Sequence, residues 1–226
     1  MSEDILDLPL FPVDTVLFPE MELPLHIFEE RYQLMIQECL ERDRQFGVVL
    51  ANSGAESGNL AQVHTVGTSA LITQVDLLED EHLDIMTTGL ERFRVLYMLR
   101  TEPYMVGRVE LVPIANSDSP QISRLVKRIK TLFVRYLRLS NEVLGTMVQI
   151  EDVPYDAVSL AYLVAMSLQV SSEEKQELLN ASTLLNLLSK ESLILSREES
   201  LLNRMREVQH NNKGYVHGVS EYLALS

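Results

Sequence analysis

The spacing of the apolar residues changes once along this 226-residue chain, near residue 115. Before that point, short runs of β-branched and aromatic residues are separated by Gly, Asn, Asp and Pro, which is typical of β-strands. After it, apolar residues recur every three or four positions, as they do on one face of an α-helix. A chain that groups its strands and helices in this way is predicted to be an α+β protein.

The predicted strands belong to a β-rich domain over residues 1–114. They lie at residues 46–51, 67–78, 82–89, 91–100 and 104–114. Within the fourth run, Phe93, Val95 and Tyr97 alternate with Arg92, Arg94 and Leu96. This alternation predicts a curved antiparallel sheet that buries one face. Residues 52–60 are rich in Gly, Ser and Asn, which predicts a flexible loop.

One helix is expected inside the β-rich domain, from about Phe28. Its apolar stripe consists of Phe28, Tyr32, Met35, Ile36 and Cys39. The glutamates and glutamines of the same segment fall mostly on the opposite side, and Pro24 precedes it. We therefore expect a helix packed on the sheet, with Cys39 in the core and not acting as a nucleophile.

The second part of the chain is predicted to be an α-helical bundle over residues 122–208, after a boundary at 115–121. Helices are expected at 122–139, 156–170, 172–180 and 182–208. Ser171 with Glu174 forms a capping-box pattern, and Ser182 is the expected cap of the last helix. That helix should end near Val208, which leaves 209–226 as a flexible tail.

Composition excludes several classes of partner. The formal net charge of −14 argues against nucleic acid and against anionic membrane surfaces. A single cysteine permits no internal disulfide and fits a reducing compartment. The acidic start of the chain lacks the basic and apolar regions of a signal peptide, and no apolar run has the length of a membrane span. These features predict a cytoplasmic protein.

The segment PLHIFEERYQLMI (24–36) holds the polar residues most suggestive of an active site, which are His26, Glu29 and Arg31. It lacks the HExxH spacing, and the chain contains neither a phosphate-binding glycine loop nor a GxSxG elbow. We expect no catalytic residue, no cofactor and no metal. His26 is interpreted as a capping or hydrogen-bonded residue, and Glu29 and Arg31 as charged ties between helix and sheet. The alternative is an enzyme of unrecognised type with a polar pocket around these three side chains.

Residues 8–36 closely resemble the opening of the N-terminal substrate-binding domain of Lon ATP-dependent proteases, and weaker likeness extends to about residue 206. The residues that carry the match are Pro9, Phe11, Pro12, Pro24, Phe28, Glu29, Arg31 and Tyr32. The resemblance implies a twisted, barrel-like, PUA-like β-domain followed by a helical bundle. Glu20 stands where the family usually has glycine, so it either occupies a different turn or carries strain at positive φ.

The same resemblance implies a non-catalytic polypeptide-recognition module, acting as an adaptor or sensor in protein quality control. Its implied partners are unfolded or tagged polypeptides and a separate protease or chaperone, and a homo-oligomer is possible. The chain shows neither the ATPase nor the peptidase module, so we expect a stand-alone member of the family. The proline-bounded loop with Leu17, Phe18, Met21 and Leu23 is the predicted binding surface. A place in the core is favoured for Leu17 and Leu23, and for Phe18 and Met21 the alternatives are balanced.

Overall fold

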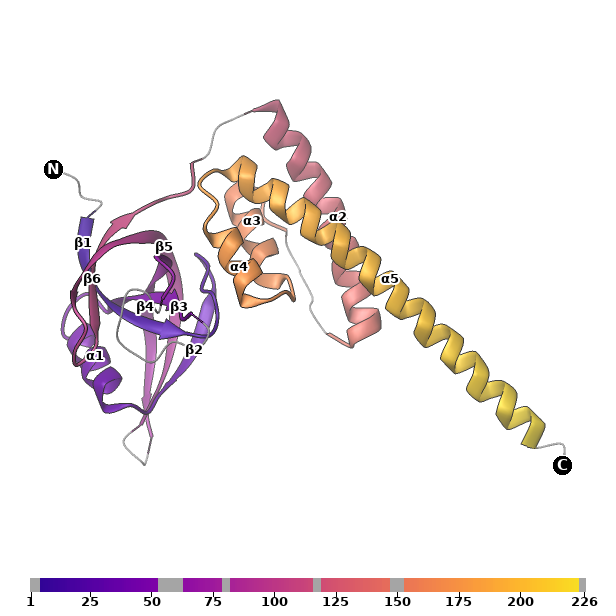
Figure 1. The fold of residues 1–226 in the computed structure, drawn as a ribbon, viewed down its shortest axis with the longest axis horizontal. Helices are drawn as coiled ribbons and strands as arrows, with labels where there is room; N and C mark the ends of the chain where they lie inside the picture. Colours follow the sequence, from indigo (N-terminus) through magenta and orange to yellow (C-terminus); the bar gives the residue numbers. More distant parts are fainter. Residues whose placement is uncertain (1–4, 53–62, 79–81, 116–118, 147–152, 224–226) are drawn as a thin grey trace.

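The fold has a β-rich half and a helical half, and the C-terminal part of the last helix projects away from both (Figure 1). The computed structural model describes residues 5–52, 63–78, 82–115, 119–146 and 153–223, with side chains of the last helix described as far as Gln209. The β-rich half consists of β1 (Ile5–Val13), β2 (Glu22–Ile27), α1 (Glu30–Leu40), β3 (Gln45–Leu50), β4 (Val66–Leu77), β5 (Leu83–Arg100) and β6 (Met105–Leu111). The helical half consists of α2 (Pro120–Leu144), α3 (Ala157–Ser167), α4 (Ser172–Leu179) and α5 (Leu184–Leu223).

The strands form one mixed six-stranded sheet in the order β2-β5-β4-β3-β1-β6. Strand β6 also pairs with the second half of β5, so the ladders from β5 through β4, β3, β1 and β6 return to β5. The predicted all-antiparallel sheet is wrong at one ladder, because β1 pairs with β3 in parallel. The chain between them contains β2 and α1, which is long enough to bring β3 back in the direction of β1.

Strand β5 joins two of the predicted strands into a single strand of 18 residues. Its first half pairs with β2 and its second half with β6. A register shift between Val95 and Tyr97 breaks the predicted alternation, because a bulge turns the following side chains to other faces. Phe93 and Val95 are buried as expected, whereas Tyr97 is exposed and Arg92 is buried.

The turn between β1 and β2 places Glu20 at φ 68°, so the strained alternative for this residue is correct. The Glu20 amide donates to the Gly89 carbonyl at 2.9 Å, and the Gly89 amide donates to the Met21 carbonyl at 2.8 Å. A Cβ at Gly89 would lie 2.2 Å from the carbonyl oxygen of Phe18. The turn is therefore pressed directly onto β5, and only glycine fits beneath it.

Helix α1 buries Tyr32, Met35, Ile36 and Cys39 against the sheet, as the sequence predicted. Burial raises the pKa of the Cys39 thiol to about 12, which keeps it protonated and unreactive. The prediction is wrong for Phe28, whose side chain is 59% exposed. Because α1 begins at Glu30, Phe28 lies in the extended link before the helix and not on its apolar stripe.

In the helical half, α2 and α5 lie side by side and run in the same direction, and α5 extends beyond the end of α2 (Figure 1). The capping prediction is confirmed at Ser171, which accepts a hydrogen bond from the Glu174 amide at 3.2 Å. At the last helix, Thr183 takes the place predicted for Ser182 and accepts from the Asn186 amide at 3.2 Å. The backbone of α5 stays helical to Leu223, so the predicted end near Val208 is wrong.

The two halves share one apolar core. Val16, Phe18, Leu50 and Val66 from the β-rich half belong to the same buried cluster as the inner faces of the four later helices. The Phe18 and Tyr162 rings lie 6.4 Å apart across the junction. Residues 53–60 of the predicted loop and 116–118 of the predicted boundary lie outside the described residues. None of the described helices is long and apolar enough to cross a membrane.

Candidate functional site

The predicted binding loop between β1 and β2 is largely buried. The exposed fraction is 0% for Phe18, 2% for Leu17 and 8% for Leu23. Met21 is half-buried. It packs against the core shared with the helices and against a second buried cluster, which contains Leu17, Leu23 and the buried residues of α1. The prediction of an exposed apolar surface is therefore wrong for Phe18, because α3 covers it through Tyr162. For Leu17 and Leu23 the favoured place in the core is confirmed.

A cleft of about 370 Å³ lies beside the segment that carries the family resemblance. One wall is the end of β1, the opposite wall is the end of β2 with the start of α1, and the floor comes from the turn between β5 and β6. The lining residues are Phe11, Pro12, Val13, Asp14, Leu25, His26, Phe28, Glu29, Arg31, Tyr32, Ala51, Val63, Thr101, Tyr104 and Met105. The polar and aromatic residues singled out by the sequence thus meet at one opening.

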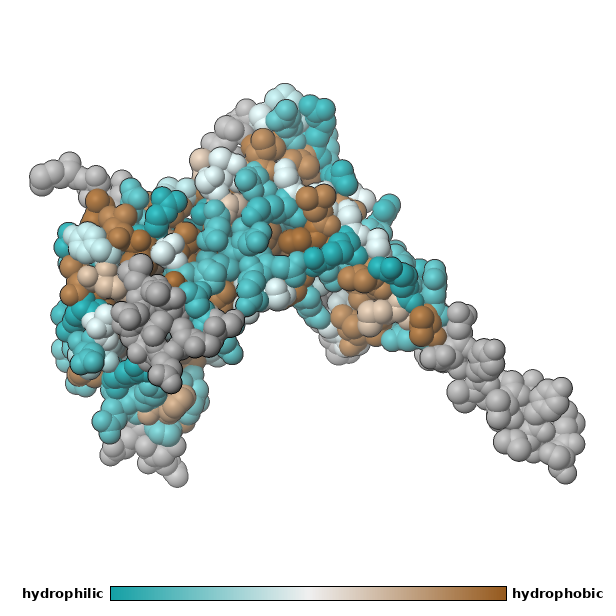
Figure 2. Space-filling view, in the orientation of Figure 1, coloured by the Kyte–Doolittle hydropathy of each residue, from teal (hydrophilic) through white to brown (hydrophobic). Residues whose placement is uncertain are grey.

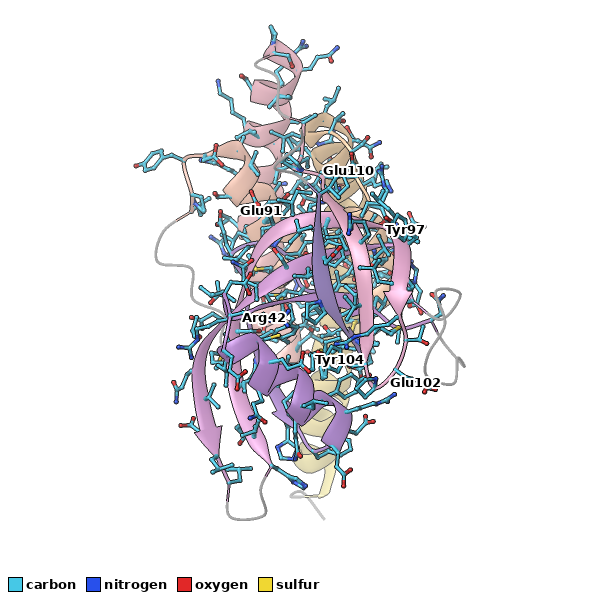
Figure 3. All side chains as sticks on the ribbon, turned by 90° about the vertical axis from the view of Figure 1, so that its left-hand side faces the viewer. Arg42, Glu91, Tyr97, Glu102, Tyr104 and Glu110 are labelled. Carbon is cyan, nitrogen blue, oxygen red and sulfur yellow. The ribbon has the colours of Figure 1, made fainter. Side chains whose placement is uncertain are left out.

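The apolar part of the cleft is rigid. The ring of Phe11 contacts that of Tyr32 edge-on at 4.5 Å and that of Phe46 at 6.0 Å. Tyr104 donates a hydrogen bond to the Glu38 carboxylate of α1 at 2.6 Å, and burial with this bond raises the Tyr104 pKa to about 12. Figure 3 shows Tyr104 beside α1. These contacts hold the aromatic floor in place before any ligand arrives.

The charged residues at the rim bond to each other. The Glu29 carboxylate accepts from Arg31 at 2.8 Å, and the Arg31 guanidinium also lies 4.6 Å from the centre of the Tyr32 ring. Glu29 and Arg31, which were expected to tie the helix to the sheet, form an ion pair with each other at the start of α1. This pair lies where the chain enters α1, and its charged groups are close in sequence to the exposed ring of Phe28.

His26 is hydrogen-bonded, which is one of the two roles expected for it. Its Nδ1 lies 2.7 Å from a carboxylate oxygen of Asp84 on β5, and both side chains are half exposed. The His26 ring stacks on Phe28 at 6.0 Å and meets His82 edge-on at 5.4 Å. His26, Glu29 and Arg31 therefore line one cleft, but His26 is bonded to Asp84 and Glu29 to Arg31, so the carboxylate and the imidazole do not act on one another.

A second hollow of about 320 Å³ lies on the outer face of the sheet. It is lined by Pro24, Leu25, His26, Gln74, Asp76, Asp84, Ile85 and Met86. Sequence reasoning missed this feature, because its residues come from three strands that are paired only in the folded protein. Across the described part of the chain, no group of three His, Cys, Asp or Glu side chains gathers in a way that could hold a metal ion.

Apolar side chains are also exposed where α5 leaves α2. They are Leu144, Leu201, Met205 and Val208, and they lie near the end of the described surface of α5 (Figure 2). The Arg206–Glu142 ion pair lies beside them. The cleft beside β2 is the better candidate for specific recognition, because it combines a hollow with aromatic and polar side chains.

The family follows from the model that matches this chain over residues 7–197, described as the ATP-dependent protease La (LON) substrate-binding domain. The chain belongs to this family. The match includes the whole of the cleft and most of the described helical half.

The curated relatives are far longer than this chain. The Lon protease of Syntrophus aciditrophicus is 29% identical over 209 residues, which cover 89% of this chain and 26% of that protein. The Lon protease of Koribacter versatilis is 30% identical over 215 residues, which cover 92% of this chain and 26% of that protein. The chain thus spans about a quarter of the length of these relatives, within the part that the substrate-binding domain occupies.

Solved structures show the same fold. The Lon N-terminal domain protein from Xanthomonas campestris is 25% identical, with a TM-score of 0.61 over 82% of this chain and 96% of that one. The N-terminal domain of Mycobacterium avium complex Lon protease is 16% identical, with a TM-score of 0.62 over 86% of this chain and 98% of that one. The predicted resemblance to Lon N-terminal domains is therefore confirmed.

Proposed function

We propose that this protein is a non-catalytic polypeptide-recognition module that acts as an adaptor or sensor in protein quality control. Two observations support the proposal. The chain belongs to a family defined by substrate binding, and it matches only that part of its longer relatives. Its cleft combines a rigid apolar floor with a ring, that of Phe28, left 59% exposed at the rim. The second observation carries the proposal, because a single exposed apolar residue is ordinary but one beside a preformed cleft offers a docking point.

The physical basis is the burial of an apolar side chain of the bound polypeptide. Unfolded chains expose aliphatic and aromatic residues that folded proteins hide. Such a side chain would enter the cleft beside Phe11 and Tyr104 and cover the ring of Phe28. The Glu29–Arg31 pair at the rim would remain solvated and discourage the entry of an isolated charge.

The enzyme alternative has weaker support. A general acid or base must reach the reacting group with its lone pair or proton available. Glu29 is bonded to Arg31 and His26 to Asp84, and each of these side chains is partly exposed to water. The cleft is therefore better suited to holding a side chain than to transferring a proton.

The sequence also predicted a separate protease or chaperone as the partner that would unfold or cleave a bound polypeptide, and this partner is part of the same proposal. A homo-oligomer and a cytoplasmic location, also expected from the sequence, stay predictions.

A direct test is the binding of a permanently unfolded protein, such as reduced and carboxymethylated α-lactalbumin carrying a fluorescent label. We expect the wild-type chain to raise the fluorescence anisotropy of this probe, and Phe28→Ser to weaken binding about tenfold, equivalent to about 1.4 kcal/mol of lost apolar burial. Leu193→Ser is the matched control, because Leu193 is 73% exposed on α5, far from the cleft. Absence of binding by the wild-type chain, or equal losses in the two variants, would contradict the proposal.

A further inference from the structure

Among the described residues, strand β2 forms an edge of the sheet, because its pairing there is with β5 alone. The hydrogen bonds show which of its main-chain groups face outward. The Gly89 amide donates to the Met21 carbonyl, which makes Met21 and Gly89 a hydrogen-bonded pair in the register of this ladder. Hydrogen-bonded and non-hydrogen-bonded pairs alternate along an antiparallel ladder. Leu23, Leu25 and Ile27 therefore direct their main-chain groups at β5.

The residues between them direct their main-chain groups away from the sheet. These are Glu22, Pro24 and His26, all exposed. Pro24 has no N–H, so the outward edge offers three carbonyl acceptors and two amide donors. Because position 24 faces outward, the missing N–H of Pro24 removes no hydrogen bond to β5. The edge therefore lacks an amide donor at its centre, at Pro24, and its main-chain groups on either side of Pro24 can still pair with an extended partner.

The two hollows lie on either face of this edge. Leu25 and His26 line both of them. Pro24 and His26 point their side chains to the outer face, where the hollow of about 320 Å³ lies. Leu25 and Ile27 point inward, on the side of the cleft of about 370 Å³. Because side chains alternate along an extended chain, a strand added to β2 would present successive residues to the two hollows in turn.

The outer hollow is acidic. His26, Asp84 and Asp76 stand opposite one another on β2, β5 and β4. Asp76 and Asp84 are cross-strand partners, and their like charges repel. The Asp84 carboxylate is bonded to His26 and the Asp76 carboxylate accepts from Gln74, each at 2.7 Å, and a carboxylate bonded in this way still has lone pairs for a further donor. An added strand would lie about 10 Å from β5 and about 14 Å from β4, two and three strand spacings away. An extended lysine or arginine side chain could meet the carboxylate of Asp84 between the strands, and Asp76 would act on that side chain at longer range. The outer hollow therefore complements a basic side chain.

The inner cleft complements an apolar one. The rings of Phe11, Phe28 and Tyr104 line it, and the charges at its rim pair with each other. The overall charge of −14 adds attraction for basic chains and increases their rate of association.

We propose that the free edge of β2 binds an extended polypeptide segment as an additional strand, and that it selects segments in which basic residues alternate with aliphatic or aromatic ones. The basic side chains occupy the outer hollow with Asp76 and Asp84, and the apolar side chains occupy the cleft beside Phe28. This inference rests on the proposed function and names the substrate class for the same site.

The test uses three labelled peptides of one composition, measured by fluorescence anisotropy with the full chain. The first alternates lysine with leucine or phenylalanine, the second groups the lysines at one end, and the third is the alternating peptide with methyl groups on every second amide. We expect the alternating peptide to bind about tenfold more tightly than either of the others. Equal binding of the alternating and grouped peptides, or no loss on methylation, would overturn the inference.

Variants of the protein identify the two hollows. Asp76→Asn should weaken the alternating peptide about threefold to fivefold and reduce the salt dependence of binding. Glu207→Gln on α5 makes the same change of net charge at an exposed position and should have no effect. Phe28→Ser should weaken the same peptide, with Leu193→Ser again as the control. Equal behaviour of Asp76→Asn and Glu207→Gln would overturn the role of the outer hollow.

The two proposals fail in different ways. If labelled α-lactalbumin binds but the peptides bind alike, the chain recognises polypeptides elsewhere and the β2 edge is refuted. If the alternating peptide binds as expected but α-lactalbumin does not, the edge is supported and general recognition of unfolded proteins is refuted. If neither probe binds, both proposals are overturned.

Discussion

Glu191 on α5 is completely buried, and neither of its carboxylate oxygens has a hydrogen-bond partner. Burial raises the pKa of this carboxyl well above its ordinary value of 4.5. The folded protein therefore holds the Glu191 proton at pH values where the unfolded chain releases it. A buried polar group without a partner typically costs about 1–3 kcal/mol of stability. Glu191→Met keeps the length of the side chain and removes this cost.

We expect Glu191→Met to raise the free energy of unfolding at pH 7 by about 1–3 kcal/mol, or the melting temperature by about 4–8 °C for a gain near 2 kcal/mol. The effect should depend on pH in a direction opposite to that of a salt-bridged carboxylate. Because the folded pKa is the higher one, the contribution of Glu191 is most favourable below the unfolded pKa. As the pH rises from the unfolded pKa towards the folded pKa, this contribution to stability decreases by about 1.4 kcal/mol per pH unit.

Urea unfolding followed by circular dichroism, from pH 4 to pH 9, measures both quantities. Glu191→Gln serves as the isosteric control, because it cannot ionise and should remove the pH slope while keeping an unpaired polar group. The reasoning is refuted if Glu191→Met destabilises the protein at every pH, or if the slope of the wild type persists in both variants. The first result would mean that the Glu191 side chain stabilises the fold, and the second that the pH dependence comes from other groups.

Three further predictions concern the strained turn and the core. Glu20→Gly should be more stable than Glu20→Ala by about 1 kcal/mol in urea unfolding, because glycine tolerates φ 68° better than alanine does. Both variants lose the 2.9 Å hydrogen bond to Ser159, so the difference between them reports the strain, and an alanine variant of equal or greater stability would refute it. Gly89→Ala should lower stability by about 2–3 kcal/mol, since its Cβ would lie 2.2 Å from the Phe18 carbonyl oxygen, and a loss below about 0.5 kcal/mol would refute this packing. The Cys39 thiol, with its pKa raised to about 12 by burial, should react with a thiol reagent at pH 7 only as fast as the chain unfolds; immediate reaction of the native protein would contradict its burial.

The sequence by itself was sufficient for features that depend on neighbouring residues. The period of apolar positions predicted the strand-rich half, the helical half and the buried stripe of α1, because a regular element buries whichever face its own spacing makes apolar. The cap at Ser171 needs only the residue three positions later. For Glu20, the glycine usual in the family left two alternatives, a different turn or strain, and the structure decided for strain at φ 68°.

Only the tertiary structure decided which apolar surfaces are covered. The segment around Phe18 has the composition of an exposed loop, and nothing local reveals that Tyr162, far along the chain, packs against it. Phe28 fits the period of an apolar stripe, yet the helix starts two residues later and the ring stays exposed. In the same way, a glutamate within the polar-looking α5 lies in the core because neighbouring elements enclose it.

The candidate site shows the same division. The sequence drew attention to His26, Glu29 and Arg31. It could not show that His26 bonds to Asp84 or that Glu29 bonds to Arg31. The outer hollow comes from β2, β4 and β5. Its β2 residues, 24–26, become neighbours of 74–76 and 84–86 only through strand pairing. Periodicity determines which face of an element is apolar, whereas long-range pairing determines what covers that face and which edge of the sheet stays open.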